Sequence, residues 1–188
     1  MNLLHRWLCA SSCWKQTVET SILPWVLDEI ELGPNVLEIG SGPGVTTDIL
    51  RTRVRSLTCV EIDQGLAASL KHRTAGKNVT VLHEDATVMS FANETFDAAL
   101  SFTMLHHVPS PVLQDRLLSE VIRVLRPGGL FAGTDSVYSR PFGLLHLFDT
   151  MVIVDPKTFP ERLRSVGFVE IEVDVRRNAF RFRARRSH

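Results

Sequence analysis

Three glycines at alternate positions, Gly40, Gly42 and Gly44, follow a short apolar run and precede a segment with a helical pattern. Glycine permits a tight turn and lets a ligand approach the backbone where a Cβ atom would collide. The loop ends where a helix is expected to begin, and a helix N-terminus carries unpaired N–H groups and partial positive charge. Residues 36–48 therefore predict a strand, a loop that can bind a nucleotide, and a helix.

The spacing of this loop discriminates between two classes of nucleotide-binding protein. A dinucleotide-binding loop has the pattern G-x-G-x-x-G, with an acid about 20 residues later. Here Gly44 comes one residue early, and Val45 stands where that pattern has Gly or Ala. Glu38 precedes the loop, where a carboxylate can meet an ammonium group but would repel a pyrophosphate. The loop resembles the first motif of class I S-adenosylmethionine-dependent methyltransferases, and a glycine-rich turn without a ligand is the alternative.

Residues 57–63 predict a second strand, and this strand ends in acids. In a doubly wound sheet the carboxyl end of such a strand lies beside the first loop, where ligands bind. A carboxylate there can accept charge-assisted hydrogen bonds from both hydroxyls of a ribose. The resemblance implies this role for Glu61, with Ile62 packed on adenine. Asp63 is the alternative ribose ligand, but we expect it to be the N-cap of a helix over 64–71.

Residues 79–83 predict a third strand, which Asp85 and Ala86 follow closely. The resemblance implies that Asp85 accepts a hydrogen bond from the exocyclic amine of adenine and that the N–H of Ala86 donates to a ring nitrogen. A solvated acidic loop is the alternative. The full set of cofactor-binding residues implied by the resemblance is Glu38, Gly40, Ser41, Gly42, Gly44, Glu61, Ile62, Asp85, Ala86, Ser101 and Phe102.

The segment 103–109 follows a predicted fourth strand, 97–102, and closely resembles the corresponding segment of small-molecule methyltransferases of the ubiquinone-biosynthesis type. It lacks the Pro-containing motifs that adenine and amide N-methyltransferases and the dimethylases of ribosomal RNA carry here. It contains His106 and His107, and a neutral imidazole can act as a general base near pH 7. We predict that one of them, with His106 preferred, deprotonates an oxygen or thiol acceptor. The alternative is that the pair only shapes the loop and holds the cofactor.

The order of elements along the chain alternates strands and helices, which together with the resemblance predicts a Rossmann-like α/β fold. We expect a doubly wound, seven-stranded, mostly parallel sheet with an antiparallel C-terminal hairpin. The length suits a single domain, residues 1–188. Residues 1–34 are expected to be helical, with a kink at Pro24 or a fresh start at Ser21, because proline disrupts a helix interior.

Residues 135–158 depart from sheet alternation and are rich in apolar side chains. We expect a mostly helical insert that forms a lid over the methyl group and shapes an apolar acceptor pocket, with packing in a homodimer as the alternative. The arginine-rich stretch 176–186 is expected to pair with acids on the other strand of the C-terminal hairpin. No nucleic-acid partner is therefore expected.

Composition limits the remaining classes of function. Lys and Arg balance Asp and Glu at 21 each, so the overall charge favours neither nucleic acid nor a membrane surface. No stretch approaches the roughly 18 apolar residues of a membrane-spanning helix. Three cysteines without zinc-ligand spacing indicate no metal site and a reducing, cytoplasmic setting, although a redox pair of Cys9 and Cys13 stays open.

The expected function is transfer of a methyl group from S-adenosylmethionine to a small acceptor that is apolar or aromatic. Methylation of protein or nucleic acid is the second hypothesis, and it predicts a flatter, charged approach to the site. The third is a non-catalytic protein of the same fold that only binds the cofactor.

Overall fold

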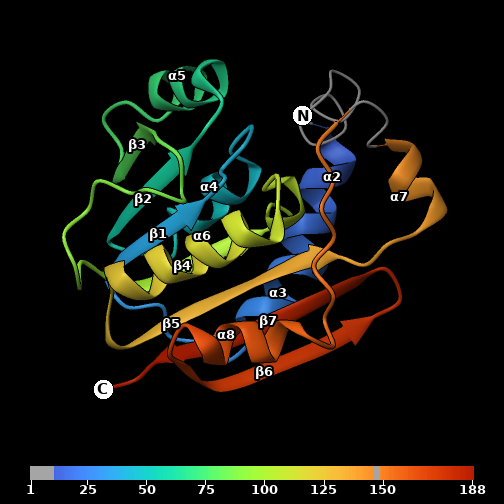
Figure 1. The fold of residues 1–188 in the computed structure, drawn as a ribbon. Coiled ribbons are helices and arrows are strands. Elements are labelled where there is room, and N and C mark those ends of the chain that lie inside the picture. The colour runs from blue at the N-terminus through green and yellow to red at the C-terminus, as the bar shows by residue number, and fades with distance from the viewer. Residues whose placement is uncertain (1–10, 146–148) are drawn as a thin grey trace.

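The computed structural model describes residues 11–145 and 149–188 (Figure 1). In this part of the chain, seven strands form one sheet in the order β3-β2-β1-β4-β5-β7-β6. The strands from β3 to β5 in that order are parallel, and β7 is antiparallel to both of its neighbours. The predicted fold class is thus confirmed. The strands are β1 (Asn35–Ile39), β2 (Ser56–Glu61), β3 (Val79–His83), β4 (Phe96–Phe102), β5 (Leu125–Ser136), β6 (Phe168–Arg176) and β7 (Ala179–Arg186).

Helices cover both faces of the sheet, as Figure 1 shows. One apolar core joins β1, β4 and β5 to α6 and α8, and a second core joins the opposite face to α3, α4 and α5. Both faces of the central strands are buried, as expected for a parallel sheet. The helical elements are α2 (Ser12–Thr17), η1 (Val18–Ile22), α3 (Leu23–Leu27), α4 (Val45–Leu50), α5 (Gln64–Arg73), η2 (Leu105–His107), α6 (Pro111–Val124), α7 (Arg140–Leu145) and α8 (Phe159–Ser165).

The N-terminal helix runs from α2 through η1 into α3, and η1 is a π-helical turn. Pro24 has no N–H and would clash with the carbonyl four residues earlier in a regular α-helix. The wider π-helical spacing relieves this conflict, since the N–H of Leu23 bonds to the carbonyl of Val18. A π-helical turn, not a new helix starting at Ser21, therefore accommodates the proline.

The insert 135–158 is less helical than predicted. Helix α7 is its only helix among the described residues, and residues 149–154, here called the strap, have no regular secondary structure. The N–H of Val152 donates to the carbonyl of His106 at 2.7 Å, and the side-chain amide of Gln114 donates to the carbonyl of Val152 at 2.8 Å. These bonds to distant residues hold the strap without a helix, so the expectation of a mostly helical insert was wrong for residues 149–154.

The C-terminal hairpin explains the arginine-rich stretch. Arg181 and Asp174 form one predicted cross-strand ion pair, and Arg185 and Glu170 form another, each with an N–O distance of 3.5 Å. Arg183 instead donates to backbone carbonyls at the C-terminal end of α3. Exposed ion pairs contribute little to stability, so the clearer role of this stretch is to tie α3 to β7.

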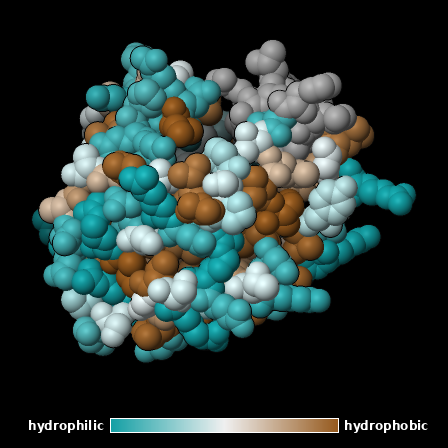
Figure 2. All heavy atoms as spheres, in the orientation of Figure 1, coloured by the Kyte–Doolittle hydropathy of each residue, from teal (hydrophilic) through white to brown (hydrophobic). Residues whose placement is uncertain are grey.

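The surface mixes polar and apolar residues. In the view of Figure 2, hydrophobic residues lie in separate groups among hydrophilic ones, and the largest group lies right of centre, over the strap. Among the described residues, no helix is long and apolar enough to cross a membrane.

Candidate active site

A cavity of about 330 Å³ lies at the carboxyl ends of β1 to β4. Parallel strands place the residues that follow them at one edge of the sheet, which is where ligands bind in doubly wound folds. The predicted site residues that line it are Gly40, Ser41, Gly42, Glu61, Ile62, Asp85, Ala86, Phe102 and His107. Four predicted residues lie outside its lining: Glu38, Gly44, Ser101 and His106.

Glu61 joins the ends of β1 and β2. One carboxylate oxygen accepts a hydrogen bond from the backbone N–H of Gly42 at 2.7 Å, and the other accepts from the N–H of Asp63 at 2.9 Å. Asp63 in turn caps α5 by accepting from the N–H of Leu66 at 2.9 Å, as predicted for the N-cap. Glu61 is therefore rigidly oriented at the cavity wall, with lone pairs left for a ligand.

The three glycines of the loop meet different surroundings, although all have positive φ. A Cβ atom on Gly42 would meet no atom within 4 Å, so this glycine borders open space. A Cβ atom on Gly40 would collide with the side chain of Met104, and one on Gly44 would collide with Arg73 and Leu70 of α5. Only Gly42 fits the expected close approach of a ligand, while the other two allow close packing within the protein.

Glu38 lies behind the loop, in the layer between β1 and α4. Its carboxylate accepts hydrogen bonds from the hydroxyls of Thr46 and Thr47 and from the thiol of Cys59. Burial raises the pKa of Glu38, and these hydrogen bonds offset part of the rise. Burial and the nearby Glu38 also raise the pKa of the Cys59 thiol, which favours its unreactive form. The expected contact of Glu38 with a cofactor ammonium is not supported by this geometry, since only Thr46 of the group reaches the cavity.

The cavity wall fits a nucleoside that carries an amino-acid group. The hydroxyl of Ser41 is buried at the wall and has no hydrogen-bond partner among the described residues. Ile62 also lines the cavity with its side chain 66% exposed, so an aromatic base can cover it. Asp85 is orientated by the N–H of Thr87, which donates to one carboxylate oxygen at 2.8 Å. The hydroxyl of Ser101 is buried too, but away from the cavity.

The two histidines face different ways. His106 is fully buried, and Asp135 accepts hydrogen bonds from both its backbone N–H and its ring Nδ1. His107 lines the cavity, with its ring centroid 4.2 Å from that of His106. The preference for His106 as the general base is therefore not supported by this geometry, since His107 and not His106 lines the cavity. No role in the site was predicted for Asp135 from the sequence, although its position as an acid at the end of an apolar strand was a visible signal.

One side of the cavity has an apolar wall from the N-terminal helix. Trp14, Val18 and Ile22 line it, and they follow one another at four-residue intervals. Of the described residues in the predicted lid 135–158, only Asp149 and Thr150 line the cavity. Among the described residues, this apolar wall comes from the N-terminal helix and not from the predicted lid, of which residues 146–148 lie outside the described part of the chain.

Thr103 is a further residue that the sequence did not single out. It follows β4, lines the cavity and has φ of 50°, which is unusual for a β-branched residue. Its N–H donates to the carbonyl of Thr134 at 2.8 Å, which holds the strained turn in place. In the described part of the chain, no group of three His, Cys, Asp or Glu side chains is placed to hold a metal ion.

Residues 37–133 match the family described as methyltransferase domain, a stretch of just over half the chain. The chain belongs to this family. The matched residues of the methyltransferase domain include all the cavity residues predicted to bind the cofactor. They exclude Trp14, Val18 and Ile22, and also the strap.

Named relatives agree with this membership. An uncharacterized methyltransferase of Mycolicibacterium vanbaalenii is 34% identical over 118 residues, covering 61% of this chain and 44% of the relative. A ubiquinone biosynthesis O-methyltransferase of Pseudomonas putida is 27% identical over 133 residues, covering 68% of this chain and 56% of the relative. The chain thus spans about half the length of the curated relatives it matches.

Solved structures share the fold. Phosphoethanolamine N-methyltransferase 2 of Haemonchus contortus superposes with a TM-score of 0.77 at 17% identity, covering 98% of this chain and 56% of that one. The family match and the relatives confirm the resemblance to class I S-adenosylmethionine-dependent methyltransferases, and with it the predicted cofactor, S-adenosylmethionine.

Proposed function

We propose that the chain is an S-adenosylmethionine-dependent methyltransferase that acts on a small acceptor with an apolar or aromatic body. The observation that carries this proposal is a single cavity in which the cofactor-binding edge of the sheet continues into the wall of Trp14, Val18 and Ile22. When bound, S-adenosylmethionine supplies an electrophilic methyl group. The protein holds donor and acceptor in line and excludes water, and good positioning can lower a barrier by about 7–11 kcal/mol.

The residues proposed to hold the donor come from the ends of three strands. Glu61 accepts the ribose hydroxyls with the lone pairs left after its two backbone contacts. Ile62 packs on the adenine, and Asp85 and Ala86 bind its edge. Ser41 offers a buried hydroxyl at the same wall. Every one of these residues lines the cavity, which supports the assignment.

His107 is the proposed general base for an acceptor that must lose a proton. Its ring Nδ1 lies 3.3 Å from the carbonyl oxygen of Thr150. A neutral ring that donates from Nδ1 leaves Nε2 as the basic nitrogen. His106 and Asp135 support this role indirectly, because their hydrogen bonds anchor the single turn that carries His107.

The acceptor atom is proposed to be oxygen or nitrogen. The Pseudomonas putida relative is named an O-methyltransferase, and the Haemonchus contortus structure is an N-methyltransferase. A protein or nucleic-acid substrate would need a flat, charged approach, whereas this cavity has a recessed apolar wall. We also propose a cytoplasmic setting, on the support that Cys13 and Cys59 are free thiols. Dimer packing stays the alternative for the insert, where Tyr138 and Leu144 are exposed.

Two measurements test the proposal. Titration calorimetry with S-adenosylhomocysteine should detect binding, and the absence of binding would remove the cofactor from this chain. A screen of phenols, catechols, amines and thiols with S-adenosylmethionine, read by mass spectrometry, should find an acceptor that gains one methyl group. If the cofactor binds but no acceptor in a broad screen is methylated, the non-catalytic hypothesis is favoured.

A further inference from the structure

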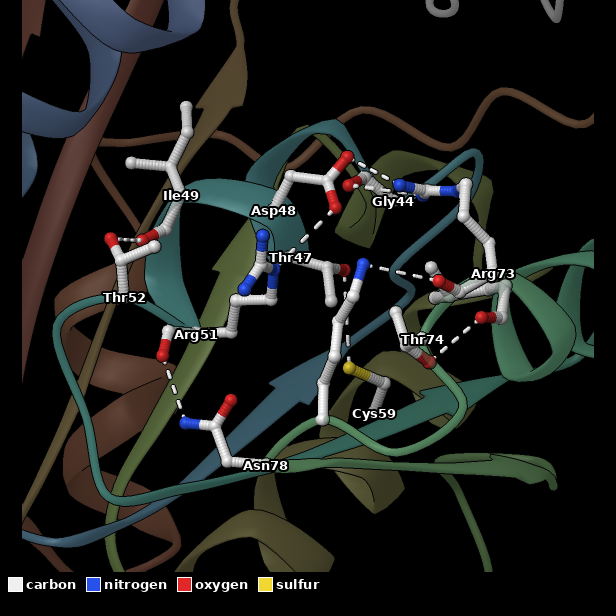
Figure 3. Close-up of polar contacts among 12 residues, drawn as sticks. Gly44, Thr47, Asp48, Ile49, Arg51, Thr52, Cys59, Arg73, Thr74 and Asn78 are labelled. Atoms are coloured by element: carbon white, nitrogen blue, oxygen red, sulfur yellow. Dashed lines mark hydrogen bonds and ion pairs between the residues drawn. The ribbon is translucent and has the colours of Figure 1, made fainter.

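The outer side of the glycine loop is held by one side chain of α5, as Figure 3 shows. Arg73 donates from Nη2 to the carbonyl of Pro43 at 2.8 Å, and more weakly to the carbonyl of Gly44 at 3.5 Å. Its Nη1 donates to the carboxylate of Asp48 in α4. The guanidinium is a planar fork with donors in fixed directions, so it can hold several acceptors at once. Arg73 therefore connects the loop, the helix after it and α5.

The loop needs such external support because its own residues are flexible. Gly40, Gly42 and Gly44 have φ of 69°, 53° and 82°, and glycine loses more conformational freedom on ordering than any other residue. The N–H of Gly44 donates to the carbonyl of Ser41 at 2.9 Å and closes a turn. This N–H belongs to the same planar peptide unit as the carbonyl of Pro43. Holding that carbonyl thus also orients the N–H that closes the turn.

The loop is held from two sides. On the cavity side, Glu61 accepts from the N–H of Gly42, and on the outer side Arg73 donates to the carbonyl of Pro43. Gly44 belongs to the outer contact, since a Cβ atom there would collide with Arg73 and Leu70. The third glycine of the motif is therefore explained by its positive φ of 82°, together with packing against α5, and not by contact with the cavity. Arg73 does not line the cavity.

We propose that Arg73 is a positioning residue for the methyl donor: it holds the glycine loop in the conformation that binds S-adenosylmethionine, without touching the cofactor. The inference rests on the proposed cofactor site. Without Arg73 the loop samples more conformations before binding. The free energy needed to order it then makes the free energy of cofactor binding less favourable. The expected loss of affinity is about tenfold, the size of one modest hydrogen-bond contribution.

The test compares three variants of the full chain by calorimetry with S-adenosylhomocysteine. Arg73→Met removes every donor and keeps the length of the side chain, and should weaken binding about tenfold. Arg73→Lys keeps the charge and replaces the planar fork with one flexible ammonium group, and should recover part of the loss. Lys71→Met is the matched control, because Lys71 lies in the same last turn of α5, is exposed and does not line the cavity. It should bind as wild type does.

A second readout separates positioning from general stability. Amide hydrogen exchange in the cofactor-free protein should become faster at Gly42 and Gly44 in Arg73→Met, with the strands β1 and β4 unchanged. Equal affinity of Arg73→Met and wild type, or an equal loss in Lys71→Met, would overturn the inference. Uniformly faster exchange would also count against it. If wild type itself binds no S-adenosylhomocysteine, the proposed function fails. If wild type binds it and Arg73→Met binds it equally well, only this inference fails.

Discussion

Glu61→Gln tests the cofactor site most directly, because the structure shows what the carboxylate already does before any ligand arrives. Its two oxygens accept the N–H groups of Gly42 and Asp63 at 2.7 and 2.9 Å, and the residue is 6% exposed. Glutamine replaces one oxygen with an NH₂ donor, so one of these N–H groups faces another donor. A partly buried donor left without its acceptor costs roughly 1–3 kcal/mol.

The same substitution weakens the proposed contact with the ribose. A hydrogen bond to a charged acceptor contributes roughly 1.5–3 kcal/mol, and glutamine loses the charge and one acceptor oxygen. The loss of this contact and the disturbed N–H of Gly42 act together, so the affinity for S-adenosylhomocysteine should fall about 10- to 100-fold. The unfolding temperature of the cofactor-free protein should fall by about 2–4 °C for each kcal/mol lost.

Calorimetry and thermal unfolding measure the two effects separately. Glu84→Gln is the matched control, since Glu84 also lines the cavity but its carboxylate is engaged by Ser90. The control should keep affinity within about twofold, a change of a few tenths of a kcal/mol. Wild-type affinity in Glu61→Gln, or the same loss in Glu84→Gln, would refute the reasoning.

Four further outcomes are expected. His107→Ala should lower turnover by about 10²- to 10⁴-fold at unchanged S-adenosylhomocysteine affinity, measured by steady-state kinetics on the acceptor found in the screen; unchanged turnover would exclude the base role. Trp14→Ala should raise the KM for that acceptor and not the affinity for the cofactor. Gly133→Ala should lower the free energy of unfolding by roughly 1–3 kcal/mol or more in urea, because its Cβ atom would collide with the backbone of Ser101. Burial raises the pKa of Glu38 from 4.5, so the native protein binds this proton more tightly and stability falls as pH rises from 4.5 to the raised value; Glu38→Gln should remove that fall in urea titrations at several pH values.

The positions of the strands along the chain were predictable because the signals for them are local. The first strand is a short apolar run that ends at a glycine, and the acids at the ends of β2 and β3 point to the ligand edge. Glu61 and Asp85 could therefore be located without a structure. The fold confirms their common edge, and their contact with the cofactor stays a prediction.

Side-chain direction was not predictable in the same way. Both faces of β1 are buried, so the apolar pattern does not reveal that Glu38 points towards α4 and away from the cavity. His106 and His107 are adjacent, and one short turn, anchored by the distant Asp135, decides which of them is exposed to the cavity. The strap likewise depends on Gln114, far away in the sequence. Long-range hydrogen bonds decided each of these cases.

The π-helical turn η1 also determines the angular position of the cavity wall that Trp14, Val18 and Ile22 form. An α-helix turns by about 100° per residue. The extra residue in the wide turn therefore rotates helix α2, which precedes it, by roughly that angle relative to α3. Deleting one residue between Val18 and Ile22 should remove this extra rotation and turn Trp14 away from the cavity, and it would bring back the clash at Pro24 that the wide turn relieves. The rotation would leave the ends of β1, β2 and β3 untouched. We therefore expect a one-residue change in length to alter the proposed acceptor site and to leave the proposed donor site in place.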